Sequence, residues 1–356
     1  DEQREKEKWE KEHEGDHNPY GSLPRMNMFT YDLGPLFERF QDSEYSFNFH
    51  EFFRTDDNGV FVHEEHVDRF LDLMCDPSED SNYPFSTKRY QEYFRHTFWV
   101  VPGVKEALAL QYKLEKHPIF CNFDVVNVAG DGDPDDPKGE ALQKVRDAII
   151  EKPKKDYTIT LSCGKLTTGV TVKEWTAVFM LAGSAETGCA HYFQTIFRCQ
   201  SPYREGMKAE CYTFDFSPVR TLTAIDQYIS NNLATTDHEA RVQKLTEFLH
   251  YCPTIIVDGG KRNQIDTETF IRYINTSYST SLIRNGFHGD CLYTDLNNLG
   301  KNDIRLLEEV AEALANAVLE ERRQRSNDIQ AAKKPAKKAK SKAAENAEKQ
   351  NEATAA

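Results

Sequence analysis

Between residues 97 and 217 the sequence alternates short apolar runs with segments of helical periodicity. The runs are apolar along their length rather than at every second position: "TFWVV", "FDVVNVAG", "YTITLSC", "TAVFMLAGS" and "ECYTFDFS". Strands of this kind are buried on both faces, which is typical of a parallel sheet covered by helices. Helical patterns separate most of them: "PGVKEALALQYKLEKHP", "KGEALQKVRDAIIEK" and "AHYFQTIFRCQ". The pattern predicts an α/β fold, a parallel sheet with helices on both faces.

The flanking sequence divides into further regions with different composition. Residues 1–95 comprise a charged leader, predicted as a solvated helix or a disordered segment over 1–17, followed by an accessory α+β region. We place the sheet domain at 96–218. Residues 219–325 are predicted to be a mainly helical extension with one strand candidate, "PTIIVDGG". Residues 326–356 are rich in Lys and Ala without an apolar anchor, so we expect a disordered tail.

Composition excludes several classes of protein. No apolar run approaches the roughly 20 residues of a membrane span. The eight cysteines are scattered without a C-x-x-C pair, which favours reduced thiols in the cytoplasm over a zinc site or disulfides. The formal charge of −14 argues against a purely electrostatic grip on nucleic acid but leaves a local basic groove open. The first residue is Asp1, so the start was processed or the chain is part of a longer one.

A loop rich in small residues follows the third apolar run. The stretch "SCGKLTTGVTVKEW" presents main-chain N–H groups and hydroxyls, which suit phosphate oxygens of a nucleotide or of a nucleic-acid backbone. A tight strand-to-helix turn is the alternative. The residues at issue are Gly164, Thr167, Thr168 and Gly169.

The stretch "HYFQTIFRCQSPYREG" carries an arginine on an otherwise apolar helix. Gln194 and Arg198 are one turn apart and share a face. A cation held against a core needs an anionic partner, which is either an internal carboxylate or a ligand phosphate. The spacing alone leaves both alternatives open.

Taken together, these stretches resemble a known family. "TTGVTVKEWTAVF" and "QTIFRCQSP" resemble motifs V and VI of superfamily 2 helicases, and "TFWVVPGVKEA" resembles motif IV, all in the family's order. The closer likeness is to helicase subunits and modules of bacterial restriction and phage-defence systems, whose last motif reads Gln-x-x-x-Arg followed by Gln-Ser/Thr-Pro. The resemblance spans most of residues 20–300 and is strongest over 97–218.

The resemblance implies a RecA-like sheet and a role as the second lobe of an ATP-dependent DNA helicase or translocase. Arg198 then contacts the ATP phosphates in trans, and Gln194 positions it. The residues implied to couple the ATP state to DNA are Gly164, Thr167, Thr168 and Gly169. The implied partners are DNA, a first RecA-like lobe, and nuclease or methyltransferase modules, and residues 1–95 become an inter-lobe region.

The chain also departs from the family pattern. Phe197 and Ser201 stand where motif VI commonly has a glycine and a second arginine, and Arg204 is the nearby candidate for that second cation. No G-x-x-x-x-G-K-[ST] loop occurs, and no Asp-Glu pair follows an apolar strand. ATP and Mg²⁺ would therefore be bound mainly by a lobe that lies upstream or on another chain, and this chain alone should not turn over ATP.

Other functions find less support. "GDGDPDDP" fails the calcium-loop pattern and is interpreted as an exposed acidic loop, so no metal site is predicted. A nuclease would need an Asp…Glu-x-Lys set that is not evident. The lysine-rich tail is expected either to bind DNA weakly or only to aid solubility. The alternative from another class is a non-catalytic nucleic-acid-binding or scaffold protein that retains a RecA-like fold.

Overall fold

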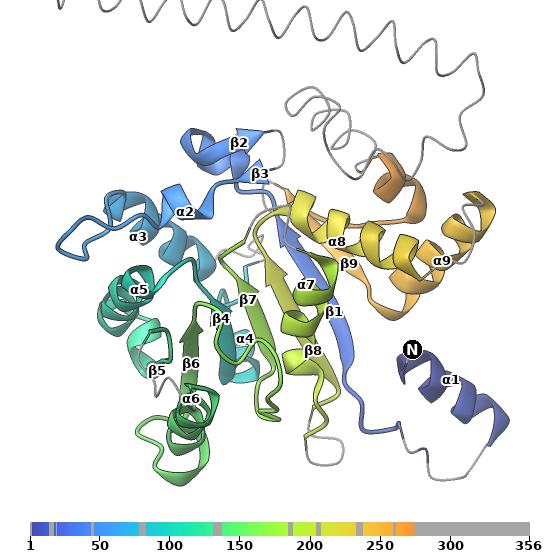
Figure 1. Cartoon of the computed structure of the whole chain (residues 1–356), viewed down its shortest axis with the longest axis horizontal. Helices are drawn as coiled ribbons and strands as arrows, with labels where there is room; N and C mark the ends of the chain where they lie inside the picture. The colour runs from blue at the N-terminus through green and yellow to red at the C-terminus, as the bar shows by residue number, and fades with distance from the viewer. Residues whose placement is uncertain are drawn as a thin grey trace, which may run out of the picture. The chain divides into compact units, whose positions relative to one another are not determined.

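An eight-stranded sheet organises the part of the chain that the computed structural model describes, namely residues 2–13, 18, 20–43, 46–77, 83–130, 137–183, 188–203, 208–232, 238–258, 261–272 and 274 (Figure 1). The strand order is β10-β9-β1-β8-β7-β4-β6-β5. Every neighbouring pair is parallel except β9 and β10, which leaves seven parallel strands. The strands are β1 (Arg25–Tyr31), β4 (His96–Val100), β5 (Phe123–Asn127), β6 (Tyr157–Ser162), β7 (Ala177–Met180), β8 (Glu210–Asp215), β9 (Thr254–Asp258) and β10 (Lys261–Gln264).

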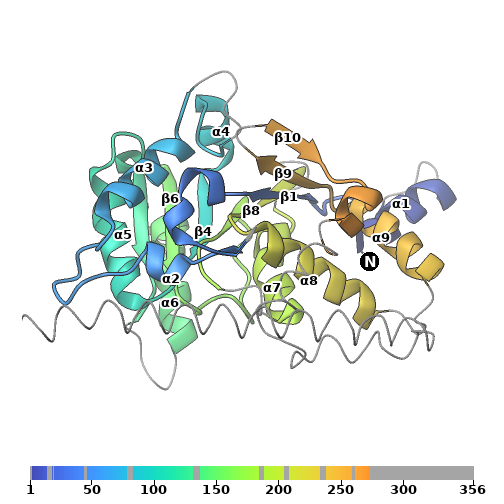
Figure 2. The same ribbon diagram turned by 90° about the horizontal axis from the view of Figure 1, so that it is seen from above.

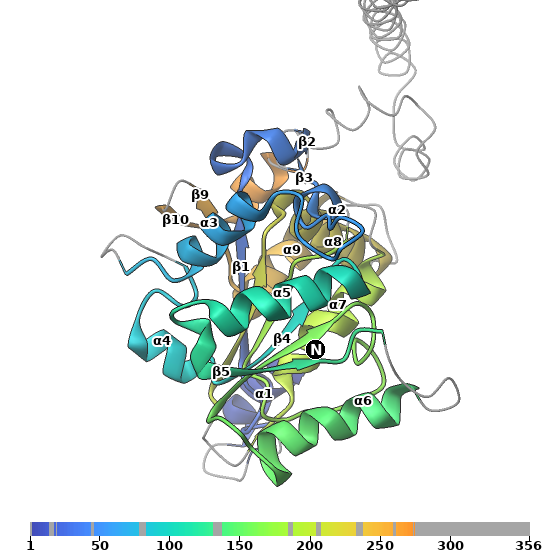
Figure 3. The same cartoon turned by 90° about the vertical axis from the view of Figure 1, so that its left-hand side faces the viewer.

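Helices lie on both faces of this sheet. In Figures 2 and 3, α3 (Glu64–Met74) and α4 (Lys88–Tyr93) are on one side of the strands, and α7 (Cys189–Ile196) and α8 (Pro218–Asn231) are on the other. The remaining helices are α1 (Glu2–Glu12), α2 (Phe49–Phe52), α5 (Val104–Lys116), α6 (Pro137–Arg146), α9 (His238–Tyr251), the π-helix η4 (Asp147–Glu151), and the short 3₁₀ turns η1 (Gly34–Leu36), η2 (Glu38–Phe40), η3 (Phe120–Asn122) and η5 (Phe197–Gln200). A separate two-stranded ribbon joins β2 (Gln41–Ser43) and β3 (Ser46–Phe47).

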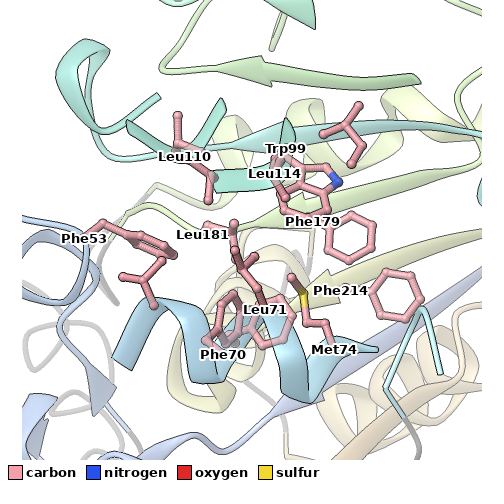
Figure 4. Close-up of a cluster of buried hydrophobic side chains, with 14 of the residues drawn as sticks. Phe53, Phe70, Leu71, Met74, Trp99, Leu110, Leu114, Phe179, Leu181 and Phe214 are labelled. Atoms are coloured by element: carbon pink, nitrogen blue, oxygen red, sulfur yellow. The ribbon is translucent and has the colours of Figure 1, made fainter. Parts of the chain in front are cut away.

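The main core fills the face that α3, α4 and α5 cover. Apolar side chains of α3 point toward aromatic residues of the central strands (Figure 4). The ring of Phe179 stacks on Trp99, with centroids 4.8 Å apart, and on Phe85, 5.5 Å apart. Burial of each such side chain stabilises the fold by roughly 1.5–3 kcal/mol. The core residues labelled in Figure 4 are Phe53, Phe70, Leu71, Met74, Trp99, Leu110, Leu114, Phe179, Leu181 and Phe214.

The predicted α/β class, with a parallel sheet and helices on both faces, is confirmed. All five apolar runs between residues 97 and 217 contain a strand of the sheet, and β7 is buried at every position. Strand β9 coincides with the strand candidate "PTIIVDGG". The leader is a helix over α1, one of its two predicted states, and its Arg4 pairs with Glu247 of α9 at 3.4 Å.

The limits of the sheet differ from the limits predicted for the sheet domain. Strand β1 comes from the predicted accessory region and β9 from the predicted helical extension, and β1 pairs with both β8 and β9. A domain cut at 96 and 218 would therefore divide one sheet. The predicted tail, the extension beyond residue 274, the acidic residues at 131–136 and Arg204 lie outside the described residues.

Candidate functional site

The loop after β6 carries the four residues predicted to contact phosphates. It leaves the carboxyl edge of the sheet, where ligands bind in open α/β sheets. The hydroxyl of Ser162 donates to the carbonyl oxygen of Lys165 at 2.5 Å, and that of Thr167 donates to the carbonyl oxygen of Gly164 at 2.8 Å. These bonds close the turn, so the hydroxyl of the buried Thr167 already has an acceptor within the loop.

Three residues of this loop have left-handed backbone conformations. The φ angles are +123° at Gly164, +63° at Leu166 and +73° at Gly169. Glycine adopts such angles freely, whereas a leucine does so at a cost of about 1–2 kcal/mol. Leu166 is nevertheless fully buried, which indicates that packing of its side chain maintains the conformation. Gly164 and Gly169 are exposed and Thr168 is half-buried, so these three remain open to a ligand.

The segment 170–175 runs from this loop to β7 with one side against the fold. Val170, Val172 and Trp175 are buried, while Thr171 and Lys173 are exposed. The indole of Trp175 stacks on Phe98 of β4, with centroids 4.5 Å apart. The outer side of the segment therefore forms a polar strip that continues from Gly169.

Helix α7 and the turn η5 place Arg198 beside that segment. Tyr192, Phe193 and Ile196 are buried, and Gln194 is exposed. The helix tightens into η5 and then stops, because the residue before Pro202 disfavours helical backbone angles. The side chain of Arg198 in η5 is half-buried.

Arg198 binds main-chain carbonyl groups. Its Nε donates to the carbonyl oxygen of Gln194 at 2.9 Å, and its Nη1 donates to that of Val170. Burial lowers the pKa of the guanidinium. Within the described residues Arg198 has no carboxylate partner and its Nη2 has no hydrogen-bond partner. The internal ion pair, one of the two alternatives predicted for this arginine, is therefore not found there.

Only some of the predicted site residues thus lie close to one another in the structure. Arg198 contacts Val170, the residue that follows Gly169, whereas Thr167 is hydrogen-bonded to Gly164 within the loop. Gln194 contacts Arg198 through its carbonyl oxygen, and among the described residues its side chain has no hydrogen-bond partner. The proposed positioning role of Gln194 stays a prediction.

A buried network that the sequence did not predict lies at the carboxyl ends of β7 and β8. Arg220 of α8 pairs with Asp215 at 2.5 Å, and both side chains are 1% exposed. The guanidinium also donates to the carbonyl oxygens of Met180, Ala182 and Gly183. The hydroxyl of Tyr192 donates to Asp215 at 3.0 Å, so the network also fixes α7. An Asp that ends an apolar strand, with an Arg five residues later in the next helix, is the sequence signal that could have revealed it.

Metal and membrane features are not found in the described part of the chain. No group of three His, Cys, Asp or Glu side chains there could hold a metal ion. None of its helices is long and apolar enough to cross a membrane. A phosphate group fits the site better than a metal ion does, because the polar groups there are a guanidinium, a hydroxyl and exposed main chain.

The sequence is similar to that of a curated bacterial protein. No protein-family model matches it. Over 285 residues the chain is 28% identical to a protein of Mycoplasma pneumoniae named "Putative type II restriction enzyme and methyltransferase RM.MpnORF110P C-terminus". The match covers 71% of this chain and 38% of that protein, so the chain spans well under half of its relative's length.

Several solved structures are also similar. They include the ATP-dependent Type ISP restriction-modification enzyme LlaBIII bound to DNA, with a TM-score of 0.39 at 11% identity over 72% of this chain and 17% of that one. The C-terminal domain of the DEAD-box protein Dbp5 has a TM-score of 0.32 at 11% identity over 71% and 98% of the two chains. T4 UvsW has a TM-score of 0.29 at 11% identity over 67% and 42%.

Proposed function

We propose that this chain is the second motor lobe of an ATP-dependent DNA helicase or translocase in a restriction or phage-defence system. It would contribute contacts to the DNA backbone and the arginine that reaches an ATP site completed by a first RecA-like lobe. The name of the Mycoplasma relative supports the restriction setting and nuclease or methyltransferase modules as partners.

The contact between Arg198 and the carbonyl oxygen of Val170 carries the proposal. The two segments that resemble motifs V and VI are 28 residues apart at this contact, and the fold brings them together. A motor needs this arrangement, because the state of the ATP site must be communicated to the residues that hold DNA.

The chemistry of the site agrees with a phosphate ligand. Phosphoryl transfer relies on cations placed where negative charge develops, and a trans-acting arginine is worth about 10³–10⁵ in rate. Arg198 would direct its Nη2 at a phosphate oxygen, while the main chain at Gly169 and the hydroxyl of Thr168 would contact the DNA backbone. Mg²⁺ would be bound by the first lobe and would neutralise phosphate charge there.

The test is a comparison of variants in the full-length protein that contains this chain, with ATP hydrolysis measured with and without DNA. Arg198→Ala should lower DNA-stimulated hydrolysis by about 10³-fold or more. The free energy of unfolding of this variant should fall by less than about 2 kcal/mol, because water can replace the half-buried hydrogen bonds of Arg198. Arg95→Ala is the matched control, since Arg95 is exposed and packs on the ring of Tyr157 near the amino end of β4.

Loss of activity that only follows the loss of folded protein would refute the catalytic role of Arg198. The 356-residue chain alone should show no hydrolysis with any DNA, because the P-loop is absent from its sequence. DNA-stimulated hydrolysis by this chain alone would overturn the assignment to a second lobe.

A non-catalytic nucleic-acid-binding or scaffold protein is the second candidate. The observation that favours it is that two nitrogens of Arg198 are already bound by main-chain carbonyl groups, as in a purely structural arginine. This candidate predicts that the full-length protein binds DNA without stimulated hydrolysis, and that Arg198→Ala changes stability alone.

A further inference from the structure

Lys208 is a buried lysine that binds the same segment as Arg198. Its Nζ donates to the carbonyl oxygen of Lys173 at 2.8 Å and to that of Trp175 at 2.9 Å. Arg198 holds the other end of the segment at Val170. Two cations that follow α7 therefore bind three carbonyl oxygens of the segment 170–175 from its inner side.

The environment of Lys208 makes this arrangement costly. The residue is 4% exposed, and no carboxylate lies within ion-pair distance of it among the described residues. Burial lowers the pKa of its amine, and the nearby ionisable groups, Cys199, Cys211 and Glu174, only oppose that effect. A buried ammonium is unfavourable unless its donors are used, so an apolar side chain would fill this space at less cost. The role of the lysine at this place is therefore to donate hydrogen bonds to these two carbonyl oxygens.

The bound segment is the one that presents the polar strip. Its inner residues are fixed by burial and by the stack of Trp175 on Phe98, while Thr171 and Lys173 face outward beside Gly169. Hydrogen bonds thus attach one end of the segment to η5 and the other end to Lys208, two residues before β8 begins. A displacement of the loop at Gly169 would then be transmitted to Arg198 through this bound segment.

We propose that Lys208 is a positioning residue that fixes the segment 170–175 to the start of β8 and thereby couples the loop at Gly169 to Arg198. The inference rests on the proposed motor function, because coupling has a consequence only where DNA binding and ATP hydrolysis are linked.

The chain offers a matched control for a test. Lys155 also donates to two main-chain carbonyl oxygens, those of Cys121 and Phe123, both at 2.8 Å, but it lies beside β5 at the edge of the sheet. Lys208→Met and Lys155→Met therefore remove the same kind of contact at two places. Lys208→Arg keeps donors at the first place and serves as the conservative variant.

The first measurement is amide hydrogen exchange in the full 356-residue chain. Lys208→Met should speed exchange over residues 169–176 by about tenfold while β4 and β6 stay protected, because the segment loses two of its attachments. Lys155→Met should leave this segment unchanged. Unchanged exchange over 169–176 in a folded Lys208→Met variant would overturn the proposal.

The second measurement is the ratio of DNA-stimulated to basal ATP hydrolysis in the full-length protein. Lys208→Met should lower this ratio by about tenfold, the size of a typical coupling effect, and Lys208→Arg should restore most of it. A merely structural role would lower both rates in proportion to the folded fraction and leave the ratio unchanged, which would also overturn the proposal. Absence of DNA stimulation in the unmodified protein is a different result, because it refutes the motor function itself.

Discussion

The hydroxyl of Tyr192 donates to Oδ2 of Asp215 at 3.0 Å and lies 3.3 Å from the hydroxyl of Thr221. Tyr192 belongs to α7, which leads into the turn η5 that carries Arg198, whereas Asp215 ends β8. The position of α7 is thus tied to the carboxyl end of the sheet by a buried polar contact in addition to apolar packing. Burial raises the pKa of Tyr192 well above its usual value, so its hydroxyl stays protonated and can donate.

Tyr192→Phe tests the strength of this contact. The change removes one donor from a buried carboxylate, so the free energy of unfolding should fall by about 1–3 kcal/mol. Tyr228→Phe is the control, since the hydroxyl of Tyr228 has no hydrogen-bond partner among the described residues and its ring also packs on Phe193. Equal stability of the two variants in urea denaturation would show that the contact contributes nothing.

Breaking the ion pair of Arg220 and Asp215 should lower the free energy of unfolding more than Tyr192→Phe does. Asp215→Asn leaves a buried guanidinium without its anion and should cost about 3–5 kcal/mol. The ring of Phe49, 5.0 Å from the guanidinium, gives little compensation. Asp226→Asn, which breaks the pair with Arg241, should cost less, because the side chain of Arg241 is 34% exposed. Chemical denaturation of both variants provides the comparison.

A double variant separates pairing from burial. Replacing Arg220 and Asp215 together by leucine should destabilise the protein by less than the sum of the single changes, because neither charge is left alone. Additive losses would mean that each residue acts through its other contacts, such as those of Arg220 with the carbonyl oxygens of Ala182 and Gly183.

Gly164→Ala tests the backbone of the loop after β6. A Cβ at this position would meet no atom within 4 Å, so the substitution adds strain at φ +123° without a clash. We expect a loss of about 1–3 kcal/mol in the free energy of unfolding. Gly188→Ala is the matched control, because its Cβ also meets no atom within 4 Å but its φ is −56°. Similar losses in urea denaturation for the two variants would contradict strain as the cause.

The sheet was predictable from the sequence where its strands are apolar throughout. Strand β7 has the run "AVFM" and is buried at every position, so its pattern and its environment agree. Strand β1, "RMNMFTY", is harder to predict, because Asn27 and Thr30 interrupt its apolar residues, although Thr30 is fully buried. Met26 of β1 pairs with Cys211 of β8, which lies 185 residues later in the chain. No local sequence pattern indicates such a pairing.

The site was predictable only where its residues belong to a local pattern. The spacing of Gln194 and Arg198 and the small residues around Gly169 are visible in the sequence, and their meeting at Val170 follows from the fold. Lys208 looks like a surface charge, because the sequence does not show that the chain folds its own carbonyl groups around it. Buried cations whose partners are main-chain atoms leave no signature in residue type.

His96, at the start of β4, should make stability depend on pH. Burial lowers the pKa of its imidazole to about 4, with a smaller effect from Arg95, whereas the unfolded chain has the ordinary value of 6.5. Between these values the unfolded state binds the proton and the folded state does not, so protonation favours unfolding. The free energy of unfolding is unaffected by this group above pH 6.5 and should fall as the pH is lowered toward 4, by about 2–3 kcal/mol in total. His96→Gln, which keeps a polar group near the hydroxyl of Thr158, should flatten this part of the profile measured by urea denaturation. If the variant and the parent lose stability in parallel between pH 6.5 and 4, other groups are responsible and the partial burial of His96 does not lower its pKa.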